Sequence, residues 1–122
     1  MSSTKGKAPR KGALQEGQAA KFLEGKGYQV LQKNYYSPFG EIDLVARQGR
    51  YLVFVEVKYR KDSKGGHPLE AVDAHKQRRI CKSALHYCLR HGYGEQTPCR
   101  FDVVGILGEE MIHVEDAFPF SG

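Results

Sequence analysis

Three charged residues, Asp43, Glu56 and Lys58, stand at one end of two strongly apolar segments of the chain. Segments 40–46 and 51–58 have the composition of β-strands and flank a turn-forming stretch, so they are expected to pair as a hairpin. Two carboxylates and an amine would then meet at one end of a sheet, where the carboxylates could hold a metal ion. An ion pair between Glu56 and Lys58 at a solvated strand end is the alternative, and both interpretations stay open at this point.

Successive side chains of a strand point to opposite faces, which sorts the residues of the hairpin into two sets. One face takes Ile42, Leu44, Ala46, Tyr51, Val53, Val55 and Val57. The other takes Asp43, Val45, Leu52, Phe54, Glu56 and Lys58. A hairpin centred between residues 48 and 49 places Asp43 opposite Phe54 and diagonal to Glu56, with the Cβ atoms of the two acids roughly 7 Å apart. Because segment 51–57 is apolar on both faces, this strand is expected to be central and covered on both sides.

A third carboxylate, Glu16, is expected to face inward from a helix over residues 13–26. Projected at helical pitch, the apolar arc of this helix consists of Ala13, Ala19, Ala20, Phe22 and Leu23. Glu16 falls inside that arc and not on the charged face with Lys21 and Glu24. An inward-facing glutamate needs a partner, although a favourable interaction with the helix dipole near the helix start also accounts for it.

Together these residues resemble the signature of the PD-(D/E)XK nuclease superfamily. Asp43 is followed, after twelve intervening residues, by Glu56-Val57-Lys58, and Glu16 matches the helix glutamate of many members. Segments 40–46, 54–60 and 100–104, with Lys76, also resemble the YraN family of small bacterial proteins, which is related in fold to archaeal Holliday-junction resolvases. The chain departs from the superfamily pattern where Ile42 replaces the proline and where no Gln-x-x-x-Tyr element follows the second strand.

The resemblance implies a restriction-endonuclease-like α/β fold with an α-β-β-β-α-β core, in which a central mixed sheet is flanked by helices. Local patterning by itself indicates only the α/β class. The expected elements are helix 13–26, strands 28–33, 41–47 and 51–59, helix 70–91, and strands 100–106 and 111–115. Pro68 suits the first turn of the second helix and Gly92 suits its end. The residues that this helix should point inward are Ile80, Ala84, Tyr87 and Cys88.

The resemblance also implies an activity and a cofactor. Asp43, Glu56 and the Val57 carbonyl would hold Mg²⁺ or Mn²⁺, with Glu16 contributing directly or through water. Lys58 would position the attacking water or stabilise the transition state. The expected function is a metal-dependent endonuclease of repair or recombination that hydrolyses nucleic acid. DNA is the expected substrate, and branched DNA is one form that it could take. A module of the same fold that binds nucleic acid or a protein without cleaving is the alternative.

The second expected helix carries a local signal for nucleic acid. Residues 74–91 contain no acid and five cations, which are Lys76, Arg78, Arg79, Lys82 and Arg90. Such a face can neutralise phosphates and fix the position of a duplex without reading its sequence. A solvated helix face is the alternative, although solvated faces usually mix both signs of charge. Lys76 is expected at the edge of the acidic site, and Arg60 could assist it.

The 122 residues fit a single endonuclease-like domain at 13–122 preceded by a basic arm at 1–12. The arm is expected to be disordered, and it holds four of the charges behind the net +5, so the overall charge says little about the domain. No segment has the apolar core of a signal peptide or the length of a membrane span, so the cytoplasm is the expected location. Three reduced cysteines are expected, and a homodimer stays open.

Overall fold

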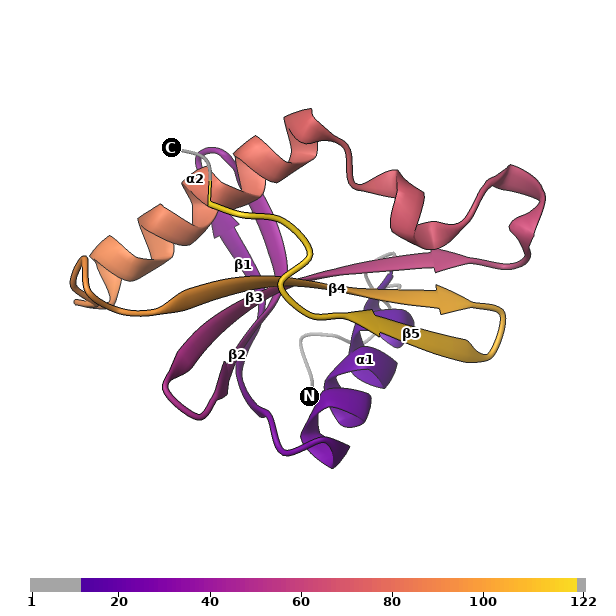
Figure 1. Cartoon of the computed structure of the whole chain (residues 1–122), viewed down its shortest axis with the longest axis horizontal. Helices are drawn as coiled ribbons and strands as arrows, with labels where there is room; N and C mark the ends of the chain where they lie inside the picture. The colour runs from indigo at the N-terminus through magenta and orange to yellow at the C-terminus, as the bar shows by residue number, and fades with distance from the viewer. Residues whose placement is uncertain (1–11, 121–122) are drawn as a thin grey trace, which may run out of the picture.

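Across residues 12–120, which the computed structural model describes apart from the side chains of residues 70 and 71, a five-stranded sheet is flanked by two α-helices (Figure 1). The helices are α1 (Ala13–Gly25) and α2 (Ala74–Arg90). The strands are β1 (Gln29–Ser37), β2 (Gly40–Gln48), β3 (Tyr51–Arg60), β4 (Cys99–Leu107) and β5 (Glu110–Val114). Two short 3₁₀ segments, Ser63–Gly65 and Pro68–Ala71, connect β3 to α2. The basic arm expected at residues 1–12 lies outside the described residues except for Gly12.

The strands are ordered β1-β2-β3-β4-β5, and every neighbouring pair is antiparallel except β3 with β4. Parallel neighbours need a crossover connection, and α2 provides it. The α-β-β-β-α-β order and the mixed central sheet are therefore confirmed, and the architecture is consistent with a restriction-endonuclease-like core. Within the described residues, no helix combines the length and the apolar composition that crossing a membrane requires.

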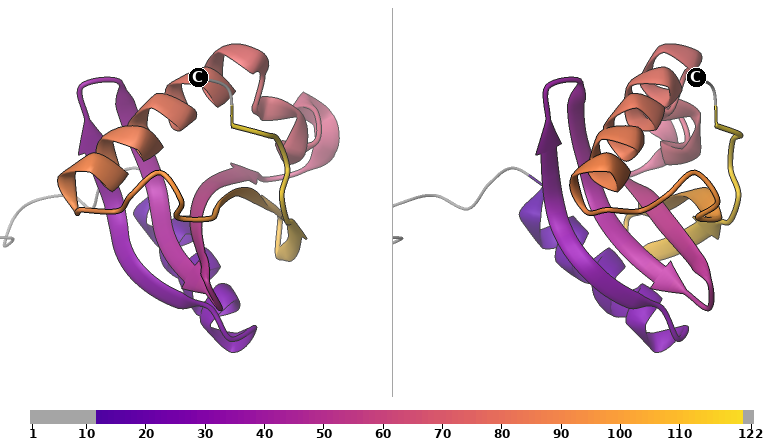
Figure 2. Two further views of the ribbon diagram at one scale, coloured as in Figure 1. Left: turned by 60° about the vertical axis from the view of Figure 1, so that its left-hand side comes forward. Right: turned by 90° about the vertical axis from the view of Figure 1, so that its left-hand side faces the viewer.

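The two helices cover opposite faces of the sheet (Figure 2). On the α1 face, the buried core consists mainly of Ala19, Ala20, Leu23, Leu44, Ala46, Val53, Val55 and Val104. On the α2 face, it consists mainly of Val45, Leu52, Phe54, Ile80, Ala84, Tyr87, Cys88 and Phe101. Residues 52–55 of β3 are at most 1% exposed. The expectation of a central strand covered on both sides is confirmed, because one strand supplies both cores.

The register of the β2–β3 hairpin differs from the prediction. Gln48 pairs with Tyr51, so the turn consists of residues 49 and 50, and Val45 rather than Asp43 lies opposite Phe54. Gly49 has a φ of 59°, a left-handed conformation that glycine adopts without steric cost and that permits so short a turn. The predicted centre between residues 48 and 49 is therefore wrong, and Asp43 lies farther toward the end of β3 than predicted.

The predicted facing of Ile42 is also wrong. Ile42 packs in the α2 core with Val45, whereas Leu44 packs in the α1 core as predicted. Tyr35 pairs with Ile42, and the neighbouring Asn34 of β1 has a left-handed φ of 56°. Alternation along β2 therefore breaks between Ile42 and Leu44, where the pairing of β2 with β3 begins. The pairing of Tyr35 with Ile42 lengthens β1, which was expected to end at residue 33.

Helix α2 begins four residues later than predicted. Asp73 is its N-cap, and its side chain accepts a hydrogen bond of 2.9 Å from the Lys76 N–H. Pro68 opens the preceding 3₁₀ segment instead of the first turn of the helix. The predicted inward-facing residues are confirmed, because Ile80, Ala84, Tyr87 and Cys88 are all buried.

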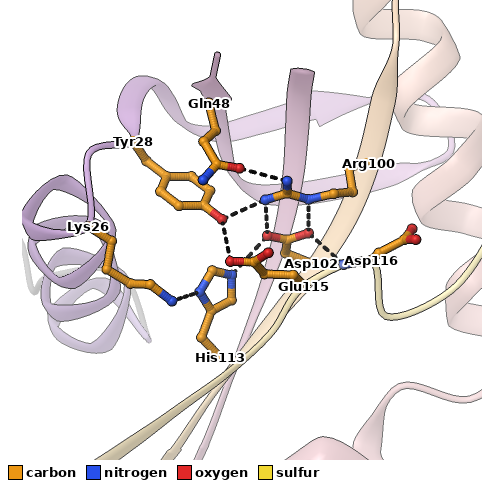
Figure 3. Close-up of polar contacts among 8 residues, drawn as sticks. All are labelled: Lys26, Tyr28, Gln48, Arg100, Asp102, His113, Glu115 and Asp116. Atoms are coloured by element: carbon orange, nitrogen blue, oxygen red, sulfur yellow. Dashed lines mark hydrogen bonds and ion pairs between the residues drawn. The ribbon is translucent and has the colours of Figure 1, made fainter. Parts of the chain in front are cut away.

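Segment 100–104, one of the segments that carry the family resemblance, builds a buried polar network (Figure 3). Asp102 is fully buried and accepts hydrogen bonds of 2.9 Å from Arg100 Nε and 2.8 Å from His113 Nε2. Arg100 Nη2 donates another bond of 2.9 Å, and the Asp116 N–H adds a fourth of 3.0 Å. Burial alone would raise the pKa of Asp102, but the bonds from His113 and Arg100 hold it below its ordinary value. This network ties β4 to β5 and to Tyr28, so the segment serves the fold.

Candidate metal and nucleic-acid site

An open pocket of about 440 Å³ lies where the start of α1, the start of β2, the end of β3 and the first turns of α2 meet. Its charged lining residues are Glu16, Glu41, Asp43, Glu56, Lys58, Arg60, Lys76 and Arg79. All four residues predicted to act in catalysis therefore line one pocket, and they come from three elements, α1, β2 and β3. Direct pairing joins β2 to β3, and α1 packs against the same face of both strands.

Three carboxylates form the acidic centre of this pocket. Glu16, Glu41 and Asp43 each offer an oxygen atom, and the three atoms lie within 4.8 Å of one another. Glu16 is only 6% exposed, so the inward orientation expected of it is confirmed. Hard cations such as Mg²⁺ and Mn²⁺ prefer carboxylate oxygens, and a group of this kind could hold a metal ion.

Glu41 is the acid that the sequence interpretation missed. It lies two residues before Asp43 in β2. Residues i and i+2 of a strand share a face, so the alternation that was applied to Asp43 could also have selected Glu41.

Asn34 links two of the acids. Its Nδ2 donates hydrogen bonds of 2.7 Å to Glu16 Oε1 and 3.0 Å to Glu41 Oε2. Its left-handed φ of 56° is a conformation in which asparagine is enriched among non-glycine residues. Asn34 was also missed, because no pattern of residue types in β1 announces a left-handed residue within a strand.

Asp43 is held by the backbone of the neighbouring strand. Its Oδ2 accepts a hydrogen bond of 2.8 Å from the Val57 N–H. Burial, together with repulsion from Glu56, Glu16 and Glu41, raises the pKa of Asp43 to about 8, against the opposing effect of the Val57 bond. The crowding of carboxylates therefore favours a cation at Asp43, whether a proton or a metal ion.

Glu56 and Lys58 form the ion pair that the sequence offered as the alternative to a metal site. Lys58 Nζ lies 3.1 Å from Glu56 Oε2. Burial would lower the pKa of Lys58, but the Glu56 carboxylate outweighs it and raises the pKa above its ordinary value. Lys58 therefore stays cationic inside the pocket. Glu56 lines the pocket beside the three-carboxylate group, with its own carboxylate paired to Lys58.

The residues predicted to contact nucleic acid divide into two sets. Arg60, Lys76 and Arg79 line the pocket, whereas Arg78 and Lys82 are exposed on α2 outside it. Contact with Lys58 lowers the pKa of Lys76 below its ordinary value, because two ammonium groups share one edge of the pocket.

Comparison with known proteins places the chain in a family. The family model described as "Uncharacterised protein family UPF0102" matches residues 15–106. The chain belongs to the UPF0102 family. A UPF0102 protein from Lachnoclostridium phytofermentans is 50% identical over 111 residues, which cover 91% of this chain and 94% of the relative. A UPF0102 protein from Chromohalobacter salexigens is 43% identical over 108 residues, which cover 88% of this chain and 86% of the relative.

The stretch matched by the UPF0102 model contains the chemistry of the pocket. Residues 15–106 include the three carboxylates of the acidic centre, the Glu56–Lys58 pair, and the cations Arg60, Lys76 and Arg79. They also include Asn34, which links Glu16 to Glu41.

Proposed function

We propose that this UPF0102 protein is a metal-dependent endonuclease that hydrolyses phosphodiester bonds in nucleic acid, with DNA, including branched DNA of repair or recombination, as its substrate. The observation that carries the proposal is the meeting of Glu16, Glu41 and Asp43 in a pocket that Lys58 also lines. Carboxylates suit a hard cation, and ammonium and guanidinium groups suit phosphate. Both kinds of group are needed where a metal ion and a phosphodiester meet.

The donor set fits Mg²⁺ or Mn²⁺. Three carboxylate oxygens lie within 4.8 Å of one another, and bonds from Asn34 and the Val57 N–H orient the carboxylates that carry them. Glu16, Glu41 and Asp43 would hold the ion, and Glu56 and the Val57 carbonyl remain proposed ligands beside them. A bound divalent ion supplies charge stabilisation at the scissile phosphate and lowers the pKa of a water molecule.

Side chains of the protein would stabilise the developing charge, bind the neighbouring phosphates and position the acids. Lys58 stays protonated beside Glu56 and can donate to a phosphate oxygen as negative charge develops there. Lys76 and Arg79 can neutralise the phosphates on either side of the scissile bond. Asn34 keeps the acids in place while the substrate binds, since its amide bonds two of them at once.

A cleavage assay tests this proposal. The purified protein is given linear duplex, flap and four-way junction DNA with Mg²⁺ or Mn²⁺. Metal-dependent cleavage is expected for the wild type, and it is expected to disappear in Asp43→Asn and Lys58→Ala. The control is Glu95→Gln, which alters an exposed acid that does not line the acidic pocket and should leave cleavage unchanged. Equal cutting by all four proteins would identify a contaminating nuclease.

The second candidate is a nucleic-acid-binding module that does not cleave. The Glu56–Lys58 ion pair favours it, because a carboxylate already paired to an ammonium group is less available to a metal ion. Tight DNA binding by the wild type without cleavage of any substrate, in either metal, would give this candidate precedence.

A further inference from the structure

One exposed tyrosine lines the acidic pocket, and a second is paired with one of its acids. Tyr59 lines the pocket and is 40% exposed. Tyr36 of β1 is 61% exposed and pairs directly with Glu41 of the acidic centre. Directly paired residues of antiparallel strands have side chains on the same face, so Tyr36 shares a face of the sheet with Glu41 at the border of the pocket. Isolated exposed aromatics are ordinary on a protein surface, but two of them beside one charged pocket need an explanation.

A third ring, Phe39, is already engaged by the protein. It is 46% exposed, and Lys82 Nζ lies 5.9 Å from its ring centroid. The His86 ring packs against it edge-on, with the centroids 6.4 Å apart. Phe39 therefore already packs against residues of α2. Tyr36 and Tyr59 are the rings considered for stacking with a ligand.

The two tyrosines occur together with cations. Arg60 follows Tyr59 in β3, and Lys76 and Arg79 line the same pocket. Proteins that bind single-stranded nucleic acid combine these two features, because cations follow the backbone while aromatic rings stack on the bases. The pocket cations therefore suit a phosphate backbone, and the two rings could contact its bases.

Stacking distinguishes unpaired from paired nucleotides. In a duplex, each base is already stacked between its neighbours, so an outside ring gains no contact with a base face. An unpaired nucleotide can turn its base toward the protein. We propose that the pocket binds a single-stranded segment of nucleic acid, with bases stacked on Tyr59 and Tyr36 and phosphates held by Lys76 and Arg79. This inference rests on the proposed function, because it takes nucleic acid as the occupant of the pocket.

The test measures binding without catalysis. Fluorescence anisotropy in EDTA compares a short single-stranded DNA, a single-stranded RNA of the same sequence and the matching DNA duplex. Tyr59→Leu and Tyr36→Leu are each expected to weaken binding to both single strands by about tenfold, the typical loss of one stacked base. The duplex affinity and the salt dependence should change little, because no cation is removed.

Two further variants make the result specific. Tyr59→Phe keeps the ring and should bind as the wild type does, which separates stacking from a change in folding. Tyr51→Leu removes a ring that is 37% exposed at the opposite end of β3, eight residues and about 26 Å away along the strand. Tyr51→Leu should bind the single strands and the duplex as the wild type does. Thermal unfolding of each variant confirms that it is folded.

The outcomes separate this inference from the proposed nuclease activity. Unchanged single-strand affinity in both site variants, or an equal loss for the duplex, would overturn the stacking inference even if the enzyme cuts DNA. A selective single-strand loss would support it even if no substrate is cleaved, because the assay contains no divalent ion. Failure of the wild type to bind either single strand would overturn the stacking inference, whereas the cleavage assay with divalent metal and branched DNA decides the proposed nuclease activity separately.

Discussion

The backbone N–H of Val57 donates a 2.8 Å hydrogen bond to the carboxylate of Asp43, so an acid of β2 is fixed by the main chain of β3. Because Val57 stands between Glu56 and Lys58, this bond places Asp43 beside both of them. The bond also turns one Asp43 oxygen toward β3, while the carboxyl group stays close to Glu16 and Glu41. A pair of neighbouring strands thereby organises most of the charged groups in the pocket.

Binding of a divalent ion should stabilise the protein. At a Mn²⁺ concentration about 100 times the Kd, linkage predicts about 2.7 kcal/mol of added stability and a Tm higher by several degrees. Asp43→Asn should remove most of this increase, because it deletes one of three carboxylates. Differential scanning calorimetry across a Mn²⁺ titration measures the effect, with Glu95→Gln as the control. An equal increase in Asp43→Asn would show that the ion acts elsewhere.

Asn34 should affect the metal through the acids that it links. Asn34→Gly keeps a residue suited to φ 56° but removes both amide bonds, so the expected result is a fall in Mn²⁺ affinity of about tenfold or more. Asn34→Ala should lose the same affinity and also destabilise the fold by about 1 kcal/mol, since alanine is strained in a left-handed conformation. Isothermal titration and urea unfolding measure the two effects separately. Normal Mn²⁺ affinity in Asn34→Gly would contradict this role.

The pocket cations should determine the salt dependence of DNA binding. Replacing Lys76 and Arg79 together by alanine removes two phosphate contacts, which should flatten the plot of log affinity against log salt by about 1.8 units on duplex DNA. Arg50→Ala serves as the control, because Arg50 is an exposed cation in the β2–β3 turn that does not line the acidic pocket. A slope unchanged by the double substitution would place the phosphate track elsewhere.

The sequence was sufficient to find the pocket residues that follow from strand alternation and helical pitch. Asp43, Glu56, Lys58 and Glu16 were selected in this way, and all of them line the pocket. The hairpin register was not predictable from alternation, because a shift by two residues keeps the same faces and only the turn at Gly49 decides between them.

Other features depended on single backbone conformations and long-range contacts. Asn34 connects Glu16 to Glu41 from a left-handed conformation within a strand, and Ile42 faces the α2 core against the alternation of β2. The start of α2 depended on Asp73 acting as a cap in preference to Pro68 beginning the helix, and both residues are common at helix starts.

The Asp102 network should determine stability without affecting the pocket. Asp102→Asn leaves Arg100 and His113 without their buried anion, so a loss of about 3 kcal/mol is expected. Mn²⁺ affinity should be unchanged, because Asp102 does not line the acidic pocket. The matched control is Asp116→Asn, whose backbone N–H still bonds Asp102 and whose side chain is exposed. Chemical denaturation and isothermal titration together test both statements.

The same network predicts how stability changes in acid. The pKa of Asp102 is lower in the folded protein than its ordinary value of 3.8, so below that value the unfolded chain binds a proton more readily. The stabilisation that Asp102 provides is therefore complete above about pH 4 and is lost as the pH falls through the folded pKa. Urea unfolding between pH 2 and pH 5 should show a shallower loss in Asp102→Asn than in the wild type, and parallel curves would contradict this assignment.

The raised pKa of Tyr28 predicts a separate loss of stability at alkaline pH. Burial and the neighbouring Asp102 charge raise the pKa of its hydroxyl from about 10 to about 12, so the folded protein keeps a proton that the unfolded chain releases. The folded state then binds more protons between these values, and its stability must fall as the pH rises from 10 to 12. Tyr28→Phe should be less stable than the wild type at pH 8, because it loses the hydrogen bonds with Arg100 and Glu115. Its stability should fall less between pH 8 and pH 11.5, because phenylalanine cannot ionise. Guanidinium unfolding at pH 8, 10 and 11.5 measures both slopes, and an identical alkaline fall in the two proteins would assign it to another group.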